Sequence, residues 1–441
     1  MRNSQHVKFG TDGIRASIGQ NHVDPQGMQA IGWAFGTVLR QHVGRPRVCI
    51  ATDTRASSAP LEFALISGLT AAGVDVHRLG IVPTAVVPFW IKDQQLDGGL
   101  MLTASHNLAT DNGVKLFNAD GRKIDSHQRD SLIDAIQHPC EINTLTRFGQ
   151  VYENHQAVAQ AYIAYIAQCI VPYKINLDMK IVIDPGFGAA SKIAEPIFQK
   201  LGFDVAMIHT DYDGYNINQA SGSTHLDALR QEVIRQKADC GCAFDGDADR
   251  VILLDSKGRE IDGDHMLFIL AMTHQETRHV VITPMSNRGL VEALEKHDIK
   301  SIVAKVGDQN IEKAMRQEHA SFGAEPNGHL IINGLNQSGD GILAAAKVLA
   351  SVKQSGKRLE KWIESFVKHP QVIVNLSYST GQEQERLKDH INEVLKAKGN
   401  ITSTVRQSGT EPVIRVLLQG HPGQEHLVTT LQRNLSVSPI A

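Results

Sequence analysis

The feature that most constrains this chain is a recurring pattern: a short β-branched run, a polar and often glycine-containing turn, and then a helical period. The runs at 48–51, 181–183, 280–283 and 302–306 are each followed by such a turn and by a helical segment. Strands that alternate with helices predict parallel α/β units. In such sheets the loops beyond the carboxyl ends of the strands line the ligand crevice, so we expect the chemistry there.

The same pattern suggests how the 441 residues are divided. Units that start near residues 47, 180 and 279 share one plan, which predicts three related α/β domains. From about Gln371 the pattern changes to strand, helix, strand, helix, with a loop at 406–412 before a strand at 413–418, which predicts a smaller α+β domain. We expect domains at residues 1–155, 156–252, 253–368 and 369–441.

Composition excludes several classes of function. The net charge of -3 provides no broad basic field for nucleic acid or an anionic membrane. The five cysteines are odd in number and contain no CxxC pair, which favours a reducing compartment. The first residues lack the apolar stretch of a secretory signal, and no apolar run approaches the ~20 residues of a membrane span. We therefore expect a cytoplasmic protein.

The most informative motif is the acidic loop Asp245-Gly246-Asp247-Ala248-Asp249-Arg250 between two apolar runs. Its carboxylates repel one another unless a cation neutralises them, and alternate spacing lets all three face one side. Oxygen ligands without His or Cys select Mg²⁺ or a similar hard ion. An EF-hand does not fit, because Arg250 stands where that motif needs Gly and Ser256 where it needs Glu. We predict a metal site at Asp245, Asp247 and Asp249.

A second motif, Thr103-Ala104-Ser105-His106-Asn107, follows the apolar run 98–102. Ser105 is a candidate nucleophile. His106 is poorly placed as a base for Ser105, because neighbouring side chains of an extended chain point in opposite directions. The GxSxG elbow of esterases is absent. Taken alone, this loop is more typical of an ordinary turn.

A third motif, Arg406-Gln407-Ser408-Gly409-Thr410-Glu411-Pro412, is a candidate anion site. Its small residues can aim successive backbone N–H groups at a phosphate. Arg406 and Arg415 can add forked, charge-assisted hydrogen bonds. An ordinary Ser/Gly hairpin with surface arginines is an equal alternative for this segment taken alone.

The turn Gly323-Ala324-Glu325-Pro326-Asn327-Gly328-His329 offers a carboxylate, an amide and an imidazole. This set suits hydrogen bonds to sugar hydroxyls, although turns favour such residues anyway.

Together these loops resemble the phosphohexose mutase superfamily. The matching segments, in order, are Phe9-Gly10-Thr11-Asp12-Gly13-Ile14-Arg15, 103–107 with Asp111-Asn112-Gly113-Val114-Lys115, 245–250 and 406–412. The segments 216–218, 222–225, 285–287 and 306–308 resemble its bacterial phosphoglucosamine mutase branch. The resemblance implies an α/β fold of four domains around a central cleft, in which three related domains carry mixed, mostly parallel sheets and the C-terminal α+β domain is smaller.

The resemblance also implies an activity. The branch interconverts glucosamine 6-phosphate and glucosamine 1-phosphate through a phosphoserine, here Ser105, and a sugar bisphosphate, on the route to UDP-N-acetylglucosamine. It implies Mg²⁺ held by Ser105 and the three aspartates. The attacking hydroxyl needs a general base, for which His106 and Lys115 are both candidates, with Arg15 as an electrostatic aid. It implies substrate contacts by Met285, Ser286, Asn287, Asp308, Glu325, Asn327, His329, Arg406, Ser408, Gly409, Thr410 and Arg415. The expected partners are a phosphorylated hexosamine and a sugar bisphosphate, with no nucleic acid and no membrane.

The chain departs from the pattern at a few positions. Leu108 stands where the superfamily usually has Pro, Gln309 where the branch usually has Arg, and Pro326 and Asn327 where it usually has Gln and Ser. The serine and aspartate motifs are intact, which predicts intact catalysis. Because the altered loops contact the sugar in the family, the same mechanism on glucose or mannose phosphates is the alternative hypothesis.

Overall fold

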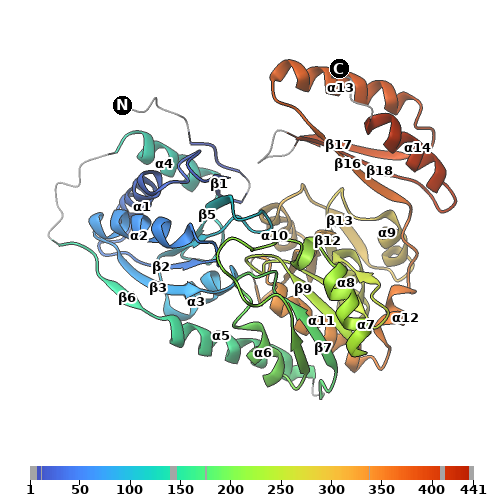
Figure 1. The fold of residues 1–441 in the computed structure, drawn as a ribbon, viewed down its shortest axis with the longest axis horizontal. Coiled ribbons are helices and arrows are strands. Elements are labelled where there is room, and N and C mark those ends of the chain that lie inside the picture. Colours follow the sequence, from blue (N-terminus) through green and yellow to red (C-terminus); the bar gives the residue numbers. More distant parts are fainter. Residues whose placement is uncertain are drawn as a thin grey trace.

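The computed structural model describes residues 7–10, 12–139, 147–173, 176–336, 338–407 and 413–436, which contain four separate β-sheets. We number the domains 1 to 4 after these sheets in chain order. Figure 1 shows domains 1 to 3 side by side and domain 4 set against one edge of them.

Domain 1 has a six-stranded sheet in the order β1-β5-β4-β2-β3-β6. Strands β4, β2, β3 and β6 are parallel, and β5 pairs antiparallel with both β4 and β1. The strands are β1 (Ile14–Ser17), β2 (Arg47–Thr52), β3 (Asp75–Ile81), β4 (Gly98–Leu102), β5 (Asp111–Asn118) and β6 (Val151–Glu153).

Side chains alternate along each strand, so apolar residues point to both faces of this sheet, and helices cover both faces. In β2, Val48 and Ile50 belong to a core with α1, α2 and α4, whereas Cys49 and Ala51 belong to a core with α3 and α5. The helices are α1 (Pro25–Arg40), α2 (Ser58–Ala71), α3 (Val86–Gln94), α4 (Ser126–Gln137) and α5 (His155–Ile170).

Domains 2 and 3 are smaller α/β units. The sheet of domain 2 runs β11-β10-β9-β7-β8, with β8, β7 and β9 parallel, and the sheet of domain 3 runs β13-β12-β14-β15, with the first three parallel. The strands are β7 (Lys180–Asp184), β8 (Asp204–Met207), β9 (Cys240–Phe244), β10 (Val251–Asp255), β11 (Glu260–Ile261), β12 (His279–Ile282), β13 (Lys300–Val303), β14 (Phe322–Ala324) and β15 (Leu330–Ile332).

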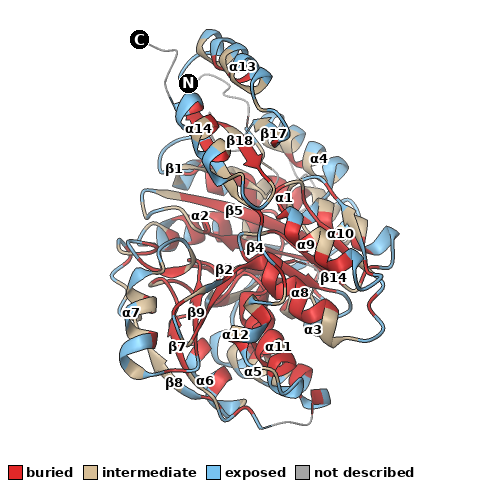
Figure 2. Ribbon diagram, turned by 90° about the vertical axis from the view of Figure 1, so that its right-hand side faces the viewer, coloured by how far each residue is buried: buried red, intermediate tan, exposed pale blue. Residues whose placement is uncertain are grey.

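One apolar core joins the first three domains. It runs from the α3 and α5 side of domain 1 through domain 2 into domain 3. Helix α11 packs against α5, α8, β9 and β10, and Figure 2 shows it buried. The helices here are α6 (Ala194–Lys200), α7 (Asp227–Gln236), α8 (Gly263–Thr273), α9 (Arg288–Glu295), α10 (Asp308–Gln317), α11 (Gly341–Gln354) and α12 (Leu359–Ile363), with short 3₁₀ turns at Val171–Tyr173 and Gly222–Thr224.

Domain 4 has a core of its own. Its antiparallel sheet β16-β18-β17 carries two helices, which Figure 1 shows on one face. The elements are β16 (Gln371–Ser377), α13 (Gly381–Lys396), β17 (Thr402–Gln407), β18 (Val413–Gln419) and α14 (Glu425–Ser436).

The predicted fold class is confirmed, including the three α/β sheets and the smaller C-terminal domain. The sequence pattern missed β17, because Val405 is its only aliphatic residue and the strand reads as polar loop. Among the described residues, no helix combines the length and apolarity that a membrane crossing requires.

Candidate active site

Ser105 lies in a tight loop directly after β4. Its φ of 53° is in the left-handed region, which is unusual for a residue with a side chain and is found mostly where surrounding contacts enforce it. Its backbone N–H donates to Thr103 Oγ1 at 2.8 Å, and its side chain is buried. The loop therefore holds the Ser105 hydroxyl in one direction.

A buried arginine that sequence reasoning did not single out supports this loop. The Arg55 guanidinium donates to four carbonyl oxygens, and its Nε donates to Asp53 Oδ2 at 2.8 Å. The four carbonyls belong to Ser105, Asn107, Leu108 and Asp111. Asn218 also donates to Ser105 O, at 2.8 Å, and Asn107 O, at 2.9 Å. The sequence showed Arg55 only as part of a turn after β2, because the carbonyls it binds lie about 50 residues away.

The acidic loop lies between β9 and β10, and its three aspartates are fully or almost fully buried. One carboxylate oxygen from each lies within 4.8 Å of the others. Gly246 allows this loop to press against the serine loop, since a Cβ there would come within 2.7 Å of Ser105 O. The predicted cluster therefore forms, and it forms next to Ser105.

The serine and the aspartates are in direct contact. Ser105 Oγ donates to Asp245 Oδ2 at 2.7 Å. Burial, together with the charges of Asp249 and Asp247, raises the pKa of Asp245 well above its ordinary value. Asp247 Oδ1 and Asp249 Oδ1 are buried and have no hydrogen-bond partner in the part of the chain that the structure describes. Buried, partnerless carboxylate oxygens fit a hard cation such as Mg²⁺.

Lys115 and Arg15 supply positive charge to the same place. Lys115 Nζ, on β5, donates to Asp247 Oδ2 at 2.7 Å and to Asp249 Oδ2 at 2.6 Å. These two carboxylates overcome burial and raise the pKa of Lys115, which stays an ammonium. Arg15 NH2 contacts Asp12 Oδ2 at 3.3 Å, and Asp12 also pairs with Lys115. Lys115 therefore contacts two aspartates of the acidic loop, and Arg15 interacts electrostatically with Asp247 and Asp249.

His106 does lie near the nucleophile, with Nδ1 3.4 Å from Ser105 Oγ. The same nitrogen is 3.2 Å from Arg250 NH1, which donates to it. Burial and the charges of Arg250 and Arg15 lower the pKa of His106 to about 2. The imidazole is neutral and too weakly basic for efficient proton abstraction at neutral pH.

The predicted sugar-binding turn after β14 is also brought to this site. His329 Nδ1 is 3.7 Å from Asp249 Oδ1, and its Nε2 accepts a hydrogen bond from the Gly339 N–H at 2.9 Å. Glu325 Oε1 accepts from Gly307 N, and Glu325 Oε2 accepts from Asn327 Nδ2 at 3.1 Å. The turn is thus braced internally and fixed against the aspartate loop.

Asp308 connects this turn to domain 1. Its Oδ2 is 2.5 Å from Lys123 Nζ and 3.7 Å from His329 Nε2, and Lys123 also pairs with Asp12. A cavity of about 520 Å³ between domains 1 and 3 is lined by Asp12, Lys123 and Asp308, among others. A space of this size can hold a phosphorylated sugar.

The segment of Met285, Ser286 and Asn287 lies at the joint with domain 4. Asn287 caps α9, and both ends of its amide are used by the protein: Nδ2 donates to His369 O at 3.0 Å, and Oδ1 accepts from Gly289 N. Gln371 Nε2 donates to Met285 O at 3.0 Å. These bonds attach the segment to the chain that leads into domain 4.

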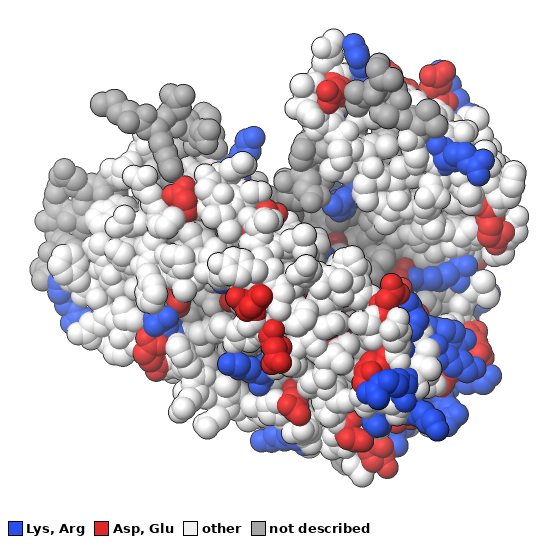
Figure 3. Space-filling view, viewed as in Figure 1, with Lys and Arg blue, Asp and Glu red and all other residues white. Residues whose placement is uncertain are grey.

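Arg406 and Arg415 face each other across β17 and β18. Burial and the neighbouring charge of Arg415 lower the pKa of Arg406, and Arg406 Nε is buried with no hydrogen-bond partner among the described residues. Two adjacent guanidinium groups repel each other unless an anion joins them. Ser408, Gly409 and Thr410 lie outside the described residues. Figure 3 shows the surface hollowed between domain 4 and the other domains.

The chain matches four family profiles that together span most of its length. These are phosphoglucomutase/phosphomannomutase alpha/beta/alpha domains I, II and III and the C-terminal domain, over residues 6–141, 160–258, 262–369 and 346–433 respectively. The chain is a member of the phosphoglucomutase/phosphomannomutase family. The resemblance seen in its motifs is therefore confirmed.

Within the phosphoglucomutase/phosphomannomutase family, similar curated proteins are named phosphoglucosamine mutase. One from Acinetobacter baylyi is 37% identical and covers 98% of both chains. One from Ectopseudomonas mendocina is 38% identical and covers 93% of this chain and 94% of that protein. These relatives agree with the branch that the sequence motifs indicated.

Solved structures share the fold of this family member over nearly its whole length. A phosphoglucomutase/phosphomannomutase family protein from Burkholderia thailandensis has a TM-score of 0.82, covers 100% of this chain and 99% of its own, and is 24% identical. An N-acetylphosphoglucosamine mutase from Aspergillus fumigatus, solved with GlcNAc-6P and magnesium, has a TM-score of 0.67, covers 99% and 96%, and is 16% identical.

Proposed function

We propose that this protein interconverts glucosamine 6-phosphate and glucosamine 1-phosphate, and that Ser105 carries the phosphoryl group between the two positions. The observation that carries the proposal is the contact of Ser105 Oγ with Asp245 Oδ2, at 2.7 Å, within a buried trio of aspartates. The relatives named phosphoglucosamine mutase, 37% identical over 98% of the chain, support the amino sugar as substrate.

The residues around Ser105 are suited to phosphoryl transfer, which depends mainly on positioning and on neutralising the phosphoryl oxygens. Asp245, Asp247 and Asp249 would hold Mg²⁺, whose charge neutralises the phosphoryl group when it is bound. Lys115 contacts two of these aspartates, Asp247 and Asp249, and adds a fixed cation. Arg55 and Asn218 hold the loop of Ser105 so that its hydroxyl keeps one direction.

Arg406 and Arg415 would grip the phosphate that is not being transferred. Their adjacent guanidinium groups supply the charge, and holding this phosphate fixes which hydroxyl faces Ser105. Glu325 and His329 would bind sugar hydroxyls. After the first transfer the sugar carries two phosphates and must turn over, so that the second phosphate can return to Ser105.

Neither His106 nor Lys115 is suited to remove the proton of the attacking hydroxyl before transfer. His106 is too weak a base, because its pKa is about 2. Lys115 is held as an ammonium by Asp247 and Asp249. Because the transition state of phosphoryl transfer is loose, the proton of the attacking hydroxyl does not have to leave early, and it ends on Ser105 Oγ as that oxygen leaves the phosphorus. We therefore place Lys115 and Arg15 in electrostatic roles.

The first test compares substrates. With Mg²⁺ and catalytic glucose 1,6-bisphosphate, kcat/KM is measured for glucosamine 6-phosphate, glucose 1-phosphate and mannose 1-phosphate. We expect a preference for the amino sugar of at least tenfold, or about 1.4 kcal/mol in transition-state binding. A preference for glucose or mannose phosphate would refute the substrate assignment and favour the alternative, with Pro326 and Asn327 as the residues to exchange first.

The second test addresses the nucleophile. Ser105→Ala is expected to abolish turnover while the protein remains folded, and phosphate on Ser105 of the wild-type protein is expected in its mass spectrum. Turnover by the Ala variant at the wild-type rate would refute the assignment. Release of inorganic phosphate without isomer formation would instead indicate a phosphatase.

A further inference from the structure

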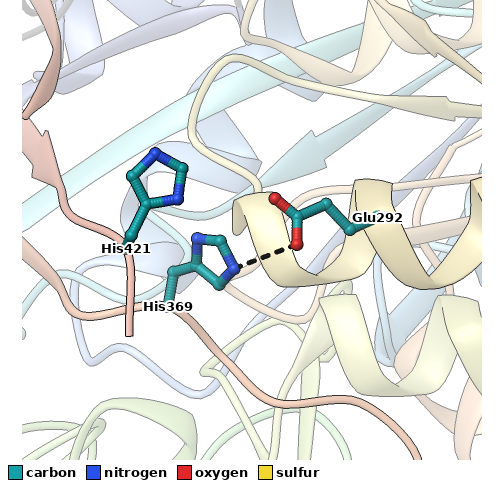
Figure 4. A group of neighbouring side chains, drawn as sticks. All are labelled: Glu292, His369 and His421. Carbon is teal, nitrogen blue, oxygen red and sulfur yellow. Dashed lines mark ion pairs between the residues drawn. The ribbon is translucent and has the colours of Figure 1, made fainter. Parts of the chain in front are cut away.

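A second group of metal-ligating side chains lies away from the aspartate loop, at the joint between domains 3 and 4. Glu292 comes from α9, His369 from the segment between α12 and β16, and His421 from the turn after β18. One donor atom of each lies within 4.8 Å of the others, and Figure 4 shows the three side chains converging. We name this group the joint cluster.

The backbone of the joint cluster is fixed by hydrogen bonds to the start of α9. The side-chain amide of Asn287 pairs with the backbone of His369: its Oδ1 accepts from His369 N at 2.9 Å, and its Nδ2 donates to His369 O at 3.0 Å. Gln419, two residues before His421, donates to Ser286 O at 3.0 Å and accepts from Arg288 N at 3.1 Å. The segments that carry His369 and His421 are thus both hydrogen-bonded to the start of α9.

The His369 imidazole is buried and has one nitrogen unused. Its side chain is only 4% exposed, and Nε2 lies 3.3 Å from Glu292 Oε2. A carboxylate at Nε2 keeps the proton on that nitrogen and leaves a lone pair on Nδ1. Nδ1 is buried and has no hydrogen-bond partner among the residues that the structure describes, which costs free energy unless a ligand satisfies it.

His421 lies on the side of that unused nitrogen. The ring centroids of His369 and His421 are 5.5 Å apart, and Figure 4 shows a ring nitrogen of His421 facing the His369 nitrogen that does not contact Glu292. Two facing imidazole nitrogens, one of them oriented by a carboxylate on its far side, are the arrangement in which histidines bind transition metals.

We propose that His369 and His421 bind a divalent transition metal such as Zn²⁺, with Glu292 orienting His369 through Nε2. Imidazole donors favour Zn²⁺, Cu²⁺ or Ni²⁺ over Mg²⁺, which separates this site from the oxygen-only aspartate loop. Arg288 Nε lies 3.3 Å from Glu292 Oε1 and leaves Oε2 to His369. A bound ion would connect the turn after β18 to the segment of His369 beside α9, and would so restrain domain 4 against domain 3.

The test is a metal titration of the full chain with the aspartate loop saturated by Mg²⁺. Co²⁺ serves as the probe, because its visible absorption reports nitrogen ligands, and Zn²⁺ then displaces it. We expect one Co²⁺ per chain, loss of the absorption band in His421→Asn, and a 10- to 100-fold lower affinity in Glu292→Gln. His426→Asn is the matched control, since His426 is an exposed histidine of α14 in the same domain.

Three results would overturn the proposal. One is the absence of a Co²⁺ band in the wild-type protein. Another is a band of unchanged strength in His421→Asn. The third is a band that Asp249→Asn removes and His421→Asn retains, which would place the ion in the aspartate loop. Circular dichroism of each variant shows whether it is folded, so that a lost site is separated from a lost fold.

Discussion

Replacing Arg55 with Met should both destabilise domain 1 and loosen the loop that carries Ser105. The guanidinium and its partner Asp53 have fully buried side chains, and the guanidinium also donates to the four carbonyls of the serine loop. Removing one partner of a buried ion pair costs about 3–5 kcal/mol, because the other charge is left unpaired. The unsatisfied carbonyls belong to the same network, so their costs do not simply add.

Calorimetry and kinetics measure the two consequences separately. For a domain of this size, about 3–5 kcal/mol corresponds to a melting temperature lower by roughly 10 °C. Since Ser105 keeps a φ of 53° only while its surroundings enforce it, kcat should fall more strongly than KM rises. The control is Arg47→Met, because Arg47 is exposed at the start of β2 and, among the described residues, its side chain donates one hydrogen bond, to Gln95 O.

If Arg55→Met melts within about 2 °C of the wild-type protein, a shift typical of an exposed pair, the buried pair does not stabilise domain 1 as expected. If the variant melts early but turns over at the wild-type rate, the serine loop does not depend on Arg55. The double variant with Asp53→Asn should be less destabilised than the sum of the two single variants.

Four further predictions follow from other contacts. Gly246→Ala should lower kcat and lower the free energy of unfolding by about 1–3 kcal/mol, because its Cβ would press on Ser105 O. Calorimetry should show no loss of stability in the control Gly381→Ala, where no described atom lies within 4 Å of the added Cβ. Burial raises the pKa of Asp340 to about 6, so the folded protein binds this proton more tightly than the unfolded chain and loses stability as the pH rises from about 4 to 6. In urea titrations, the free energy of unfolding of Asp340→Asn should therefore rise by about 3 kcal/mol relative to that of the wild-type protein over this pH range. A difference that stays constant with pH would contradict this prediction. Arg406→Gln should raise KM at least tenfold, because the variant loses one of the two guanidinium groups that bind phosphate. The melting temperature should not fall, because the substitution relieves the repulsion between Arg406 and Arg415. An unchanged KM would exclude Arg406 from the phosphate site. His106→Gln should leave the pH profile of kcat unchanged between about pH 6 and 8, and a lost limb would identify it as the base after all.

The sequence predicted the parts of the site that depend on local spacing. Asp245, Asp247 and Asp249 alternate along one loop, so their convergence follows from the geometry of a few residues. Strands such as β4 and β9 were located because buried parallel strands are continuous apolar runs.

Contacts between segments that are distant in the sequence could not be predicted from the spacing of residues along the chain. Arg55 binds carbonyls about 50 residues along the chain, and Asn218 binds the same loop from 113 residues away. The weak basicity of His106 arises from its burial and from the charges of Arg250 and Arg15, and only the tertiary fold creates this environment. The joint cluster was missed for the same reason, since Glu292, His369 and His421 come from three separate segments.

The distribution of apolar cores determines which parts of the chain can be exchanged. Domain 4 encloses its own core, whereas one continuous core passes through domains 1, 2 and 3. A graft of domain 4 from a relative therefore needs to match a hydrogen-bonded seam of polar groups, chiefly Asn287, Gln371 and Gln419, together with the joint cluster. Any cut within the first three domains would expose apolar side chains that no single domain can cover. Modular engineering of this chain, including exchange of its phosphate grip, should begin at that seam.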